Sequence, residues 1–428
     1  MHRLRSGETQ LRRTTTEADV ETPSASASLV RDRLTWLIYL QLATYGFFLY
    51  AFTPSVTLLR DDEHVSRAIS GLHGTGLAIG AVAAGALLSR LVGRLGRARL
   101  MQVGTIILCA GIVIFVSCTI VPITIAGAVV AGFGGTIVVN LSAAMLTARH
   151  PGPAGGTAVT EANGIGSGLG IVAPLLISAA IAINLGWRAG VLVAVVLAVA
   201  VRIAFRRDVI PADRQVTIQR VEPESKHMSV EFWRAIGVLV MTTAIEFLMT
   251  IWSSDVLQNH DGLSKGTAAT GVTAIVAGMT LGRLASKRFT LRYTADTLLL
   301  CVFGISLIGF ATFWVSSIVW LGFAGLFVIG LGISLQFPLA ITRAIGFSDN
   351  RADLATGYAA LGTGFAIGVA PFALGAFADQ TGSHTAMLVV PVFVVLGAIG
   401  VATTKSTPAS SDGGVRPLAI GDVPATAD

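Results

Sequence analysis

The chain has 428 residues, of which 53% are hydrophobic and 13% are charged, and its mean hydropathy is +0.74. Soluble globular domains carry about 25% charged residues, so this composition excludes an ordinary water-facing surface. Three cysteines lie in apolar runs, without the spacing of a disulfide framework or a metal site. The net charge of +6 would indicate nucleic-acid binding only if the basic residues formed one soluble patch.

Long apolar runs recur along most of the chain. A transmembrane helix needs about 20 mostly apolar residues, and twelve stretches meet that requirement. They cover approximately residues 34–58, 68–89, 99–119, 122–146, 156–182, 187–205, 234–254, 266–286, 296–315, 318–341, 354–377 and 384–403. The predicted fold class is therefore an all-α membrane protein with twelve transmembrane helices.

Basic residues are distributed unequally between the two sides of these spans. An even number of spans places both termini on one side, and that side holds all but four of the 30 Lys and Arg residues. The four exceptions are Arg60, Arg67, Arg188 and Lys265. The positive-inside rule then predicts a multi-pass protein of the cell membrane with both termini in the cytoplasm. Because this asymmetry accounts for the positive charge, nucleic acid is not an expected partner.

A long charged segment divides the twelve spans into six and six. We interpret residues 206–230 as a cytoplasmic linker between an N-terminal bundle, 34–205, and a C-terminal bundle, 231–404. The polar segments 1–33 and 405–428 are predicted to be disordered cytoplasmic tails.

Three short motifs recur in the same order in the two halves. "AVAAGALLSRL" matches "AIVAGMTLGRL" without a gap at an offset of 193 residues, and "GFG" and "VAP" recur as "GLG" and "VAP". The matched ranges are 81–91 and 274–284, 132–134 and 330–332, and 172–174 and 369–371. The chain is therefore predicted to be a duplicated six-helix unit, folded as two pseudo-symmetric bundles.

The segment after the second span resembles the signature of the major facilitator superfamily, Gly-x-x-x-Asp-Arg-x-Gly-Arg-Arg, and the resemblance extends over about residues 34 to 404. In "SRLVGRLGRAR", Ser89 replaces the first glycine of the signature and Gly93 stands at its aspartate. The resemblance implies that the residues on pattern form a cytoplasmic gate, without the contribution of that aspartate. These residues are Arg94, Gly96, Arg97 and Arg99.

A second resemblance concerns the direction of transport. Exporters of this superfamily carry a Gly-Pro pair in the fifth span, and "LGIVAPLLIS" retains Pro174 but has Ala173 before it. The resemblance therefore implies export, although the motif lacks its glycine.

Polar side chains inside the spans collect in the first and fourth spans of each half. In lipid each polar group must find a partner or line water. The family resemblance implies that these four helices line a central substrate cavity, and the polar residues independently indicate the same helices. The expected cavity residues are Gln41, Thr44, Tyr45, Asn140, Thr242, Thr250 and Gln336. Alternatively, the hydroxyls bond to their own helices, the amides join neighbouring helices, and Tyr45 only packs.

Glu246 is an acidic residue near the middle of the seventh predicted span. It lies roughly 17 Å from the start of the span at 1.5 Å per residue, and no Lys or Arg is recognisable deep in any span. A proton, a coupling ion, water or a cationic substrate is therefore expected to compensate its charge.

The expected function is secondary active transport by alternating access. Glu246 would couple transport to protons or bind a cation, and the substrate would be a small neutral or cationic amphipathic compound, with export favoured. The alternatives are uptake of a small nutrient such as a sugar, and a membrane receptor or sensor that transports nothing. The sequence has no recognisable nucleotide-binding loop, catalytic constellation or metal-ligand cluster. We therefore expect no enzymatic activity and no cofactor or metal, in a protein that acts as a monomer in the lipid bilayer.

Overall fold

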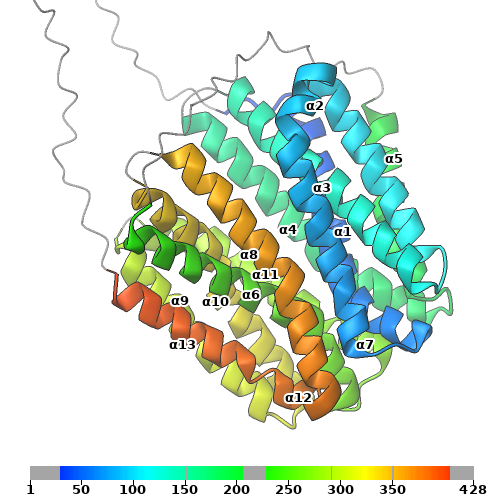
Figure 1. Cartoon of the computed structure of the whole chain (residues 1–428). Helices are drawn as coiled ribbons and strands as arrows, with labels where there is room; N and C mark the ends of the chain where they lie inside the picture. Colours follow the sequence, from blue (N-terminus) through cyan, green and yellow to red (C-terminus); the bar gives the residue numbers. More distant parts are fainter. Residues whose placement is uncertain (1–28, 151–152, 206–227, 291, 349–350, 405–428) are drawn as a thin grey trace, which may run out of the picture.

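The computed structural model describes residues 29–150, 153–205, 228–290, 292–348 and 351–404 (Figure 1). Its helices are α1 (Arg33–Glu63), α2 (Arg67–Val116), α3 (Val121–Arg149), α4 (Pro153–Ala182), α5 (Trp187–Ala204), α6 (Val230–Asn259), α7 (Lys265–Ala269), α8 (Gly271–Thr290), α9 (Ala295–Val315), α10 (Val319–Gly346), α11 (Ala352–Thr381), α12 (Ser383–Ala386) and α13 (Val389–Ala402). The predicted tails and linker lie outside the described residues, apart from residues 29–33 and 228–230.

Eleven helices or joined helix pairs in the described part are long and apolar enough to cross a membrane. One of them, α2, has 50 residues and would be about 75 Å long as a straight helix, more than twice the thickness of the hydrocarbon core. Gly96 interrupts α2 with φ 72° and ψ 158°, a conformation that glycine adopts without a Cβ clash. Because α2 therefore contains two spans, the predicted all-α fold with twelve spans is confirmed. α7 and α8 together form the eighth span, and α12 and α13 form the twelfth.

The two ends of the helical bundle are named here after the predicted orientation. The inner end is the one at which α1 begins and α13 finishes. The outer end is the one at which α1 and α6 finish. The turn of α2 is at the top of Figure 1, at the inner end, and α7 and α12 are at the bottom, at the outer end.

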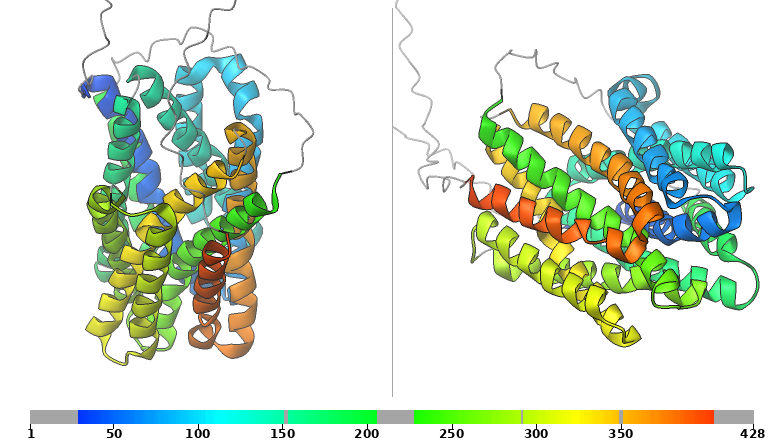
Figure 2. Two further views of the ribbon diagram at one scale, coloured as in Figure 1. Left: turned by 90° about the vertical axis from the view of Figure 1, so that its left-hand side faces the viewer. Right: turned by 60° about the horizontal axis from the view of Figure 1, so that its bottom comes forward.

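The helices form two bundles, α1–α5 and α6–α13, which lie side by side (Figure 2). Between the bundles, α2 packs against α11 and α4 packs against α8. Each of these two contacts joins an early span of one half to a late span of the other, as two related halves facing each other would do.

Glycines at the helix crossings reveal the internal duplication directly. A Cβ on Gly80 would overlap the carbonyl oxygen of Val129, and a Cβ on Gly278 would overlap that of Phe327. Gly278 follows Gly80 by 198 residues, and Phe327 follows Val129 by the same number. The same offset relates four further pairs of crowded glycines, namely Gly111 and Gly309, Gly127 and Gly325, Gly132 and Gly330, and Gly134 and Gly332. The second, third and fourth spans of each half are therefore packed alike.

This packing corrects one register predicted from the sequence. The match of 81–91 with 274–284 implied an offset of 193 residues, five fewer than the contacts require. Helices rich in Ala, Gly and Leu resemble one another in several registers. Only the glycines at a crossing are fixed, because any side chain there would collide with backbone.

The halves meet at the outer end and diverge toward the inner end. Along α2 and α11, a Cβ on Gly375 would lie 2.5 Å from the carbonyl oxygen of Arg67, near the outer end. Further inward, a Cβ on Gly364 would lie 2.8 Å from the side chain of Val82. Gly85, one helical turn beyond Val82, has open space where a Cβ would be. The described helices are thus closed against each other outside and apart inside.

Candidate functional site

Glu246 lies near the middle of α6. At 1.5 Å per residue it is roughly 24 Å from Val230 at the inner start of the helix and roughly 20 Å from Asn259 at its outer end. Its side chain is partly exposed, whereas the neighbouring Ile245 is buried. A carboxylate at this depth is costly unless a proton, water or an opposite charge compensates it.

Arg283 of α8 is a basic neighbour of Glu246. Its guanidinium interacts electrostatically with Glu246 and with the hydroxyl of Tyr50 on α1. Its Nη1 also donates a hydrogen bond of 2.9 Å to Oγ of Ser167 on α4. Tyr50 and Ser167 are both buried. These four residues, which we call the central cluster, come from α1 and α4 of one half and from α6 and α8 of the other.

Sequence alone indicated no basic residue near Glu246, and that expectation is wrong. With the offset of 198 residues, the counterpart of Arg90 is Arg288, and Arg283 corresponds to Gly85. Arg283 therefore lies five residues, or about 7.5 Å, deeper than the sequence match suggested. Its long apolar stem lets the charged end reach still further. The available signal was the distance of more than one helical turn between Arg283 and Arg288.

Three of the expected cavity residues bond to their own helices. The Oγ1 atoms of Thr44 and Thr250 donate to the carbonyl oxygen four residues earlier, each at 2.9 Å. That of Thr242 donates to the carbonyl oxygen three residues earlier, at 2.8 Å. All three side chains are buried. Their hydroxyl protons are therefore already used, and toward a substrate these groups could act only as acceptors.

The two glutamines differ in their surroundings. Nε2 of Gln336 donates to Oγ of Ser306 on α9 at 2.8 Å, so this side chain joins two helices of the C-terminal half. The Oε1 atoms of Gln336 and Gln41 are buried, and neither has a hydrogen-bond partner among the described residues. A buried amide oxygen in this state is a suitable acceptor for a water molecule or a substrate hydroxyl.

Tyr45 and Asn140 differ in their surroundings. The ring of Tyr45 lies against Gly135 of α3, where a Cβ would overlap it. Asn140, later on α3, is exposed. The contact of Tyr45 is therefore a packing contact between the first and fourth spans.

The residues of the basic signature lie around the inner turn of α2. Gly96 forms the turn, Arg94 and Arg99 are exposed, and Arg97 is partly buried. Gly93, at the position of the family aspartate, has open space where a Cβ would be. The gate function of this segment stays a prediction.

The last turn of α1, Arg60–Glu63, contacts four other helices, reaches α2 through one of them, and was not singled out from the sequence. Three acidic residues at a helix C-terminus oppose the helix dipole, so their contacts must compensate for that cost. Arg60 pairs with Asp255 of α6, and Asp61 contacts Gln258 of α6 and Lys265 of α7. Asp62 contacts Trp187 and Arg188 of α5. Glu63 contacts Thr124 of α3, which in turn contacts His73 of α2. The signal in the sequence was the run "RDDE" itself.

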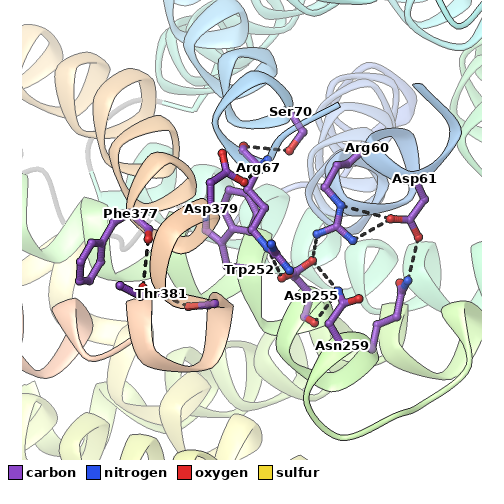
Figure 3. A network of polar contacts seen from close by, with 12 residues as sticks. Arg60, Asp61, Arg67, Ser70, Trp252, Asp255, Asn259, Phe377, Asp379 and Thr381 are labelled. Carbon is purple, nitrogen blue, oxygen red and sulfur yellow. Dashed lines mark hydrogen bonds and ion pairs between the residues drawn. The ribbon is translucent and has the colours of Figure 1, made fainter. Parts of the chain in front are cut away.

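Two aspartates of the C-terminal half hold the outer end closed (Figure 3). Asp255 is fully buried and pairs with Arg60 and with Arg67, whose Nε lies 2.9 Å from Oδ2. Asp379 of α11 accepts hydrogen bonds from the backbone N–H groups of Arg67 and Ala68 at 2.7 and 3.0 Å, at the start of α2. We call Arg60, Arg67, Asp255 and Asp379 the outer latch.

Asp61 extends the outer latch. Burial would raise the pKa of its carboxyl group, but hydrogen bonds from Gln258, Arg60 and Lys265 outweigh burial and lower that pKa. A carboxyl group whose pKa is lowered by folding stabilises the folded contact above its ordinary pKa of about 3.9. That contribution is lost as the pH falls through the lowered pKa. The outer end is therefore held by Asp61 throughout the neutral range.

The described part of the chain contains no group of three or more His, Cys, Asp or Glu side chains placed to hold a metal ion. It does contain a cavity of about 450 Å³ between α8, α9 and α10, lined mainly by apolar side chains that include Phe289, Leu331 and Leu335. Glu246 is not among its lining residues.

Comparison with known proteins gives a family match. The sequence profile of the Major Facilitator Superfamily matches residues 38–343. A search of curated protein sequences finds no match.

Several solved structures share the fold. A bacterial homologue of the human lysosomal transporter Spinster, in an inward-facing and unoccupied conformation, has a TM-score of 0.71 at 14% identity, covering 90% of this chain and 100% of that chain. The xylose transporter XylE from E. coli, in an inward-open conformation, has a TM-score of 0.69 at 12% identity, covering 89% and 97%. The nucleoside transporter NupG has a TM-score of 0.70 at 14% identity, covering 86% and 99%.

Proposed function

Because the chain belongs to the major facilitator superfamily, we propose that it is a proton-coupled secondary transporter in which Glu246 carries the coupling proton. The protein is a multi-pass membrane transporter whose two halves expose a central site alternately. The finer claims, which concern the proton, the substrate and the direction, rest on the central cluster.

The observation that supports proton coupling is the position of Glu246 beside Arg283, at mid-depth and between the halves. Burial favours the neutral carboxylic acid, while the guanidinium favours the carboxylate. The electrostatic attraction of Arg283 therefore opposes protonation of Glu246. Protonation of Glu246 would remove this attraction and strengthen the interaction of Arg283 with Ser167 and Tyr50 across the interface. The proton would in this way change a contact that must rearrange when the halves rock.

The charges of the central cluster favour a neutral substrate. Glu246 and Arg283 compensate each other, so the site carries no excess charge when the carboxylate is ionised. A small amphipathic compound could donate a hydrogen bond to the buried oxygen of Gln41, which has no partner among the described residues. A cation would have to displace Arg283 from Glu246, so the cationic class is the second candidate.

We extend the proposal to orientation and direction. The distribution of basic residues supports an inner end that faces the cytoplasm. Pro174 on α4 supports export. The described conformation, closed at the outer end, is the one in which an exporter would load substrate from the cytoplasm.

Purified protein in proteoliposomes tests this proposal. A panel of neutral and cationic amphipathic compounds would be screened with an imposed proton gradient and a pH-sensitive dye inside the vesicles. We expect at least one neutral compound to move protons and substrate in opposite directions. Movement in the same direction would replace export by uptake. If no compound of the panel moves protons, the coupling proposal fails, and a compound that binds without being transported would indicate a receptor.

A further inference from the structure

A chain of three polar side chains lies inside the N-terminal half, away from the central cluster. His73 of α2 and Thr124 of α3 are both fully buried. Oγ1 of Thr124 lies 2.9 Å from Nε2 of His73 and 2.9 Å from Oε1 of Glu63. Nδ1 of His73 lies 2.9 Å from the carbonyl oxygen of Ser70. The ring of His73 also packs edge-on against Phe115, with 6.0 Å between ring centroids.

The hydrogen atoms available to this chain can be counted. A carbonyl oxygen only accepts, so Nδ1 of His73 must carry a proton to bond Ser70. In a neutral imidazole Nε2 then has no proton and needs one from Thr124. An ionised Glu63 also needs the proton of Thr124, and a hydroxyl has only one. With neutral His73 and ionised Glu63, one of the two contacts would face acceptor to acceptor.

One additional proton resolves the conflict. It can reside on Glu63, which then donates to Thr124 while Thr124 donates to His73. It can equally reside on His73, which then donates to Thr124 while Thr124 donates to Glu63. The hydroxyl of Thr124 can instead bond the carbonyl oxygen of Val121 at 3.0 Å, and then two additional protons are required. Every arrangement that satisfies these contacts therefore contains at least one proton more than the ordinary neutral-pH forms of the two residues.

We propose that Glu63, Thr124 and His73 form a buried proton-binding site, in which one proton is shared between the carboxyl group and the imidazole through the threonine hydroxyl. The two forms differ by transfer of one proton along the chain. Glu63 loses its proton as Thr124 accepts it, and Thr124 gives its own proton to His73. The net charge of the site is zero in both.

The surroundings of Glu63 fit this site. Its Oε2 is buried and has no hydrogen-bond partner among the described residues, which would be costly for an ionised group. The charged groups that act on it electrostatically are Asp62 on the same helix and Arg188 of α5, and these two pair with each other. From α2 and α3 the site is faced by His73, Thr124 and the ring of Phe115. Glu63 itself is partly exposed at the end of α1, so protons can reach the site from the outer side.

Loss of this proton would affect the outer latch. Without it, one contact of Thr124 becomes repulsive and the end of α1 loses an attachment. Arg60 and Asp61, which join α1 to the C-terminal half, belong to the same turn. The site therefore links proton occupancy to closure of the outer end, independently of Glu246.

Spectroscopy on the purified full-length protein at about pH 8, above the ordinary pKa of both Glu (~4.3) and His (~6.5), tests this proposal. We expect the infrared spectrum to contain a protonated carboxyl band that Glu63→Gln removes, or the NMR spectrum of ¹⁵N-histidine-labelled protein to contain an imidazolium signal that His73→Gln removes. Thr124→Val should abolish either signal at this pH, and Thr124→Ser should retain it.

A wild-type protein with an ionised Glu63 and a neutral His73 at that pH would overturn the proposal. A wild-type protein that shows neither a protonated carboxyl band nor an imidazolium signal gives this outcome directly, so no variant has to fold. Glu246→Gln serves as the matched control and should leave the signal of the site formed by Glu63, Thr124 and His73 unchanged. If that variant removes the signal instead, the proton resides on Glu246 and the proposed site at Glu63, Thr124 and His73 is refuted.

Discussion

At the level of single residues, the sequence predicts where a costly group lies but not what surrounds it. The depth of Glu246 follows from counting along one apolar run, and the structure retains it. The pairing with Arg283 depends on how closely α8 approaches α1, α4 and α6, which no spacing within one helix encodes. Ser167 and Tyr50 went unnoticed for the same reason. A serine or tyrosine in an apolar run acquires meaning only from its partner.

Removing the charge of Arg283 tests the pair. Arg283→Gln leaves Glu246 without its counter-charge, and we expect a loss of about 1–3 kcal/mol in the free energy of unfolding, less than for a fully buried pair because Glu246 is partly exposed. The double variant Glu246→Gln/Arg283→Gln should regain most of that loss, because no uncompensated charge remains. Thermal unfolding of the purified variants measures both. Strictly additive destabilisation in the double variant would show that the two residues do not interact.

At the level of helices, the sequence predicts all twelve spans but places one repeat five residues out of register. Hydrophobic length is sufficient to find a span, since any run of about 20 apolar residues can cross the bilayer. Register depends on which glycine meets which backbone, and many glycines have no such role. Gly80 and Gly278 are at crossings, whereas Gly85 and Gly304 have open space around them. All four are glycines, so the sequence alone does not distinguish the two kinds.

Alanine substitutions distinguish the two kinds of glycine. Gly80→Ala and Gly278→Ala should each destabilise the protein by about 1–3 kcal/mol, because the added Cβ overlaps a carbonyl oxygen on the neighbouring helix. The controls Gly85→Ala and Gly304→Ala should be neutral or stabilise by up to about 1 kcal/mol, because alanine favours the helix. Melting temperatures of the four variants compare them directly. Equal effects at crowded and open positions would contradict the register derived from the contacts.

At the level of the whole molecule, the structure adds a conformational state that the sequence does not encode. The pattern of apolar runs predicts two bundles in either state of an alternating-access cycle. Which end is closed depends on side chains that meet across the halves, such as Asp255 with Arg60 and Arg67. The run "RDDE" marks a helix end whose charges need partners, but it does not identify those partners, because they lie on helices distant in sequence.

Breaking the outer latch should shift the population of conformations. Asp255→Asn removes the charge that holds Arg60 and Arg67, so the outer end should open in a larger fraction of molecules. Spin labels on cysteines introduced at Leu185 and Val315, both exposed near the outer end, would report a new population at longer distance. Asp32→Asn, which weakens a pair with Arg149 inside one half, is the control and should leave the distances unchanged. An identical distribution in Asp255→Asn would exclude a latch.

The orientation in the membrane is tested by labelling from outside the cell. In a background without native cysteines, Leu185→Cys at the outer turn before α5 should react with a membrane-impermeant thiol reagent. Leu95→Cys at the inner turn of α2 should react only after the cells are opened. Both side chains are exposed, Leu185 by 65% and Leu95 by 38%, so the reagent can react at either position once it is on that side of the membrane. External labelling of Leu95→Cys would reverse the predicted topology.

The central claim, that Glu246 carries the coupling proton, is tested most directly by transport with Glu246→Gln in proteoliposomes. The amide mimics the protonated carboxyl group, so the variant should fold and bind substrate. Substrate exchange at equal concentrations needs no net proton movement and should persist, while accumulation driven by a proton gradient should fall to the level of empty vesicles. Accumulation at the wild-type rate with an unchanged pH dependence would contradict the assignment.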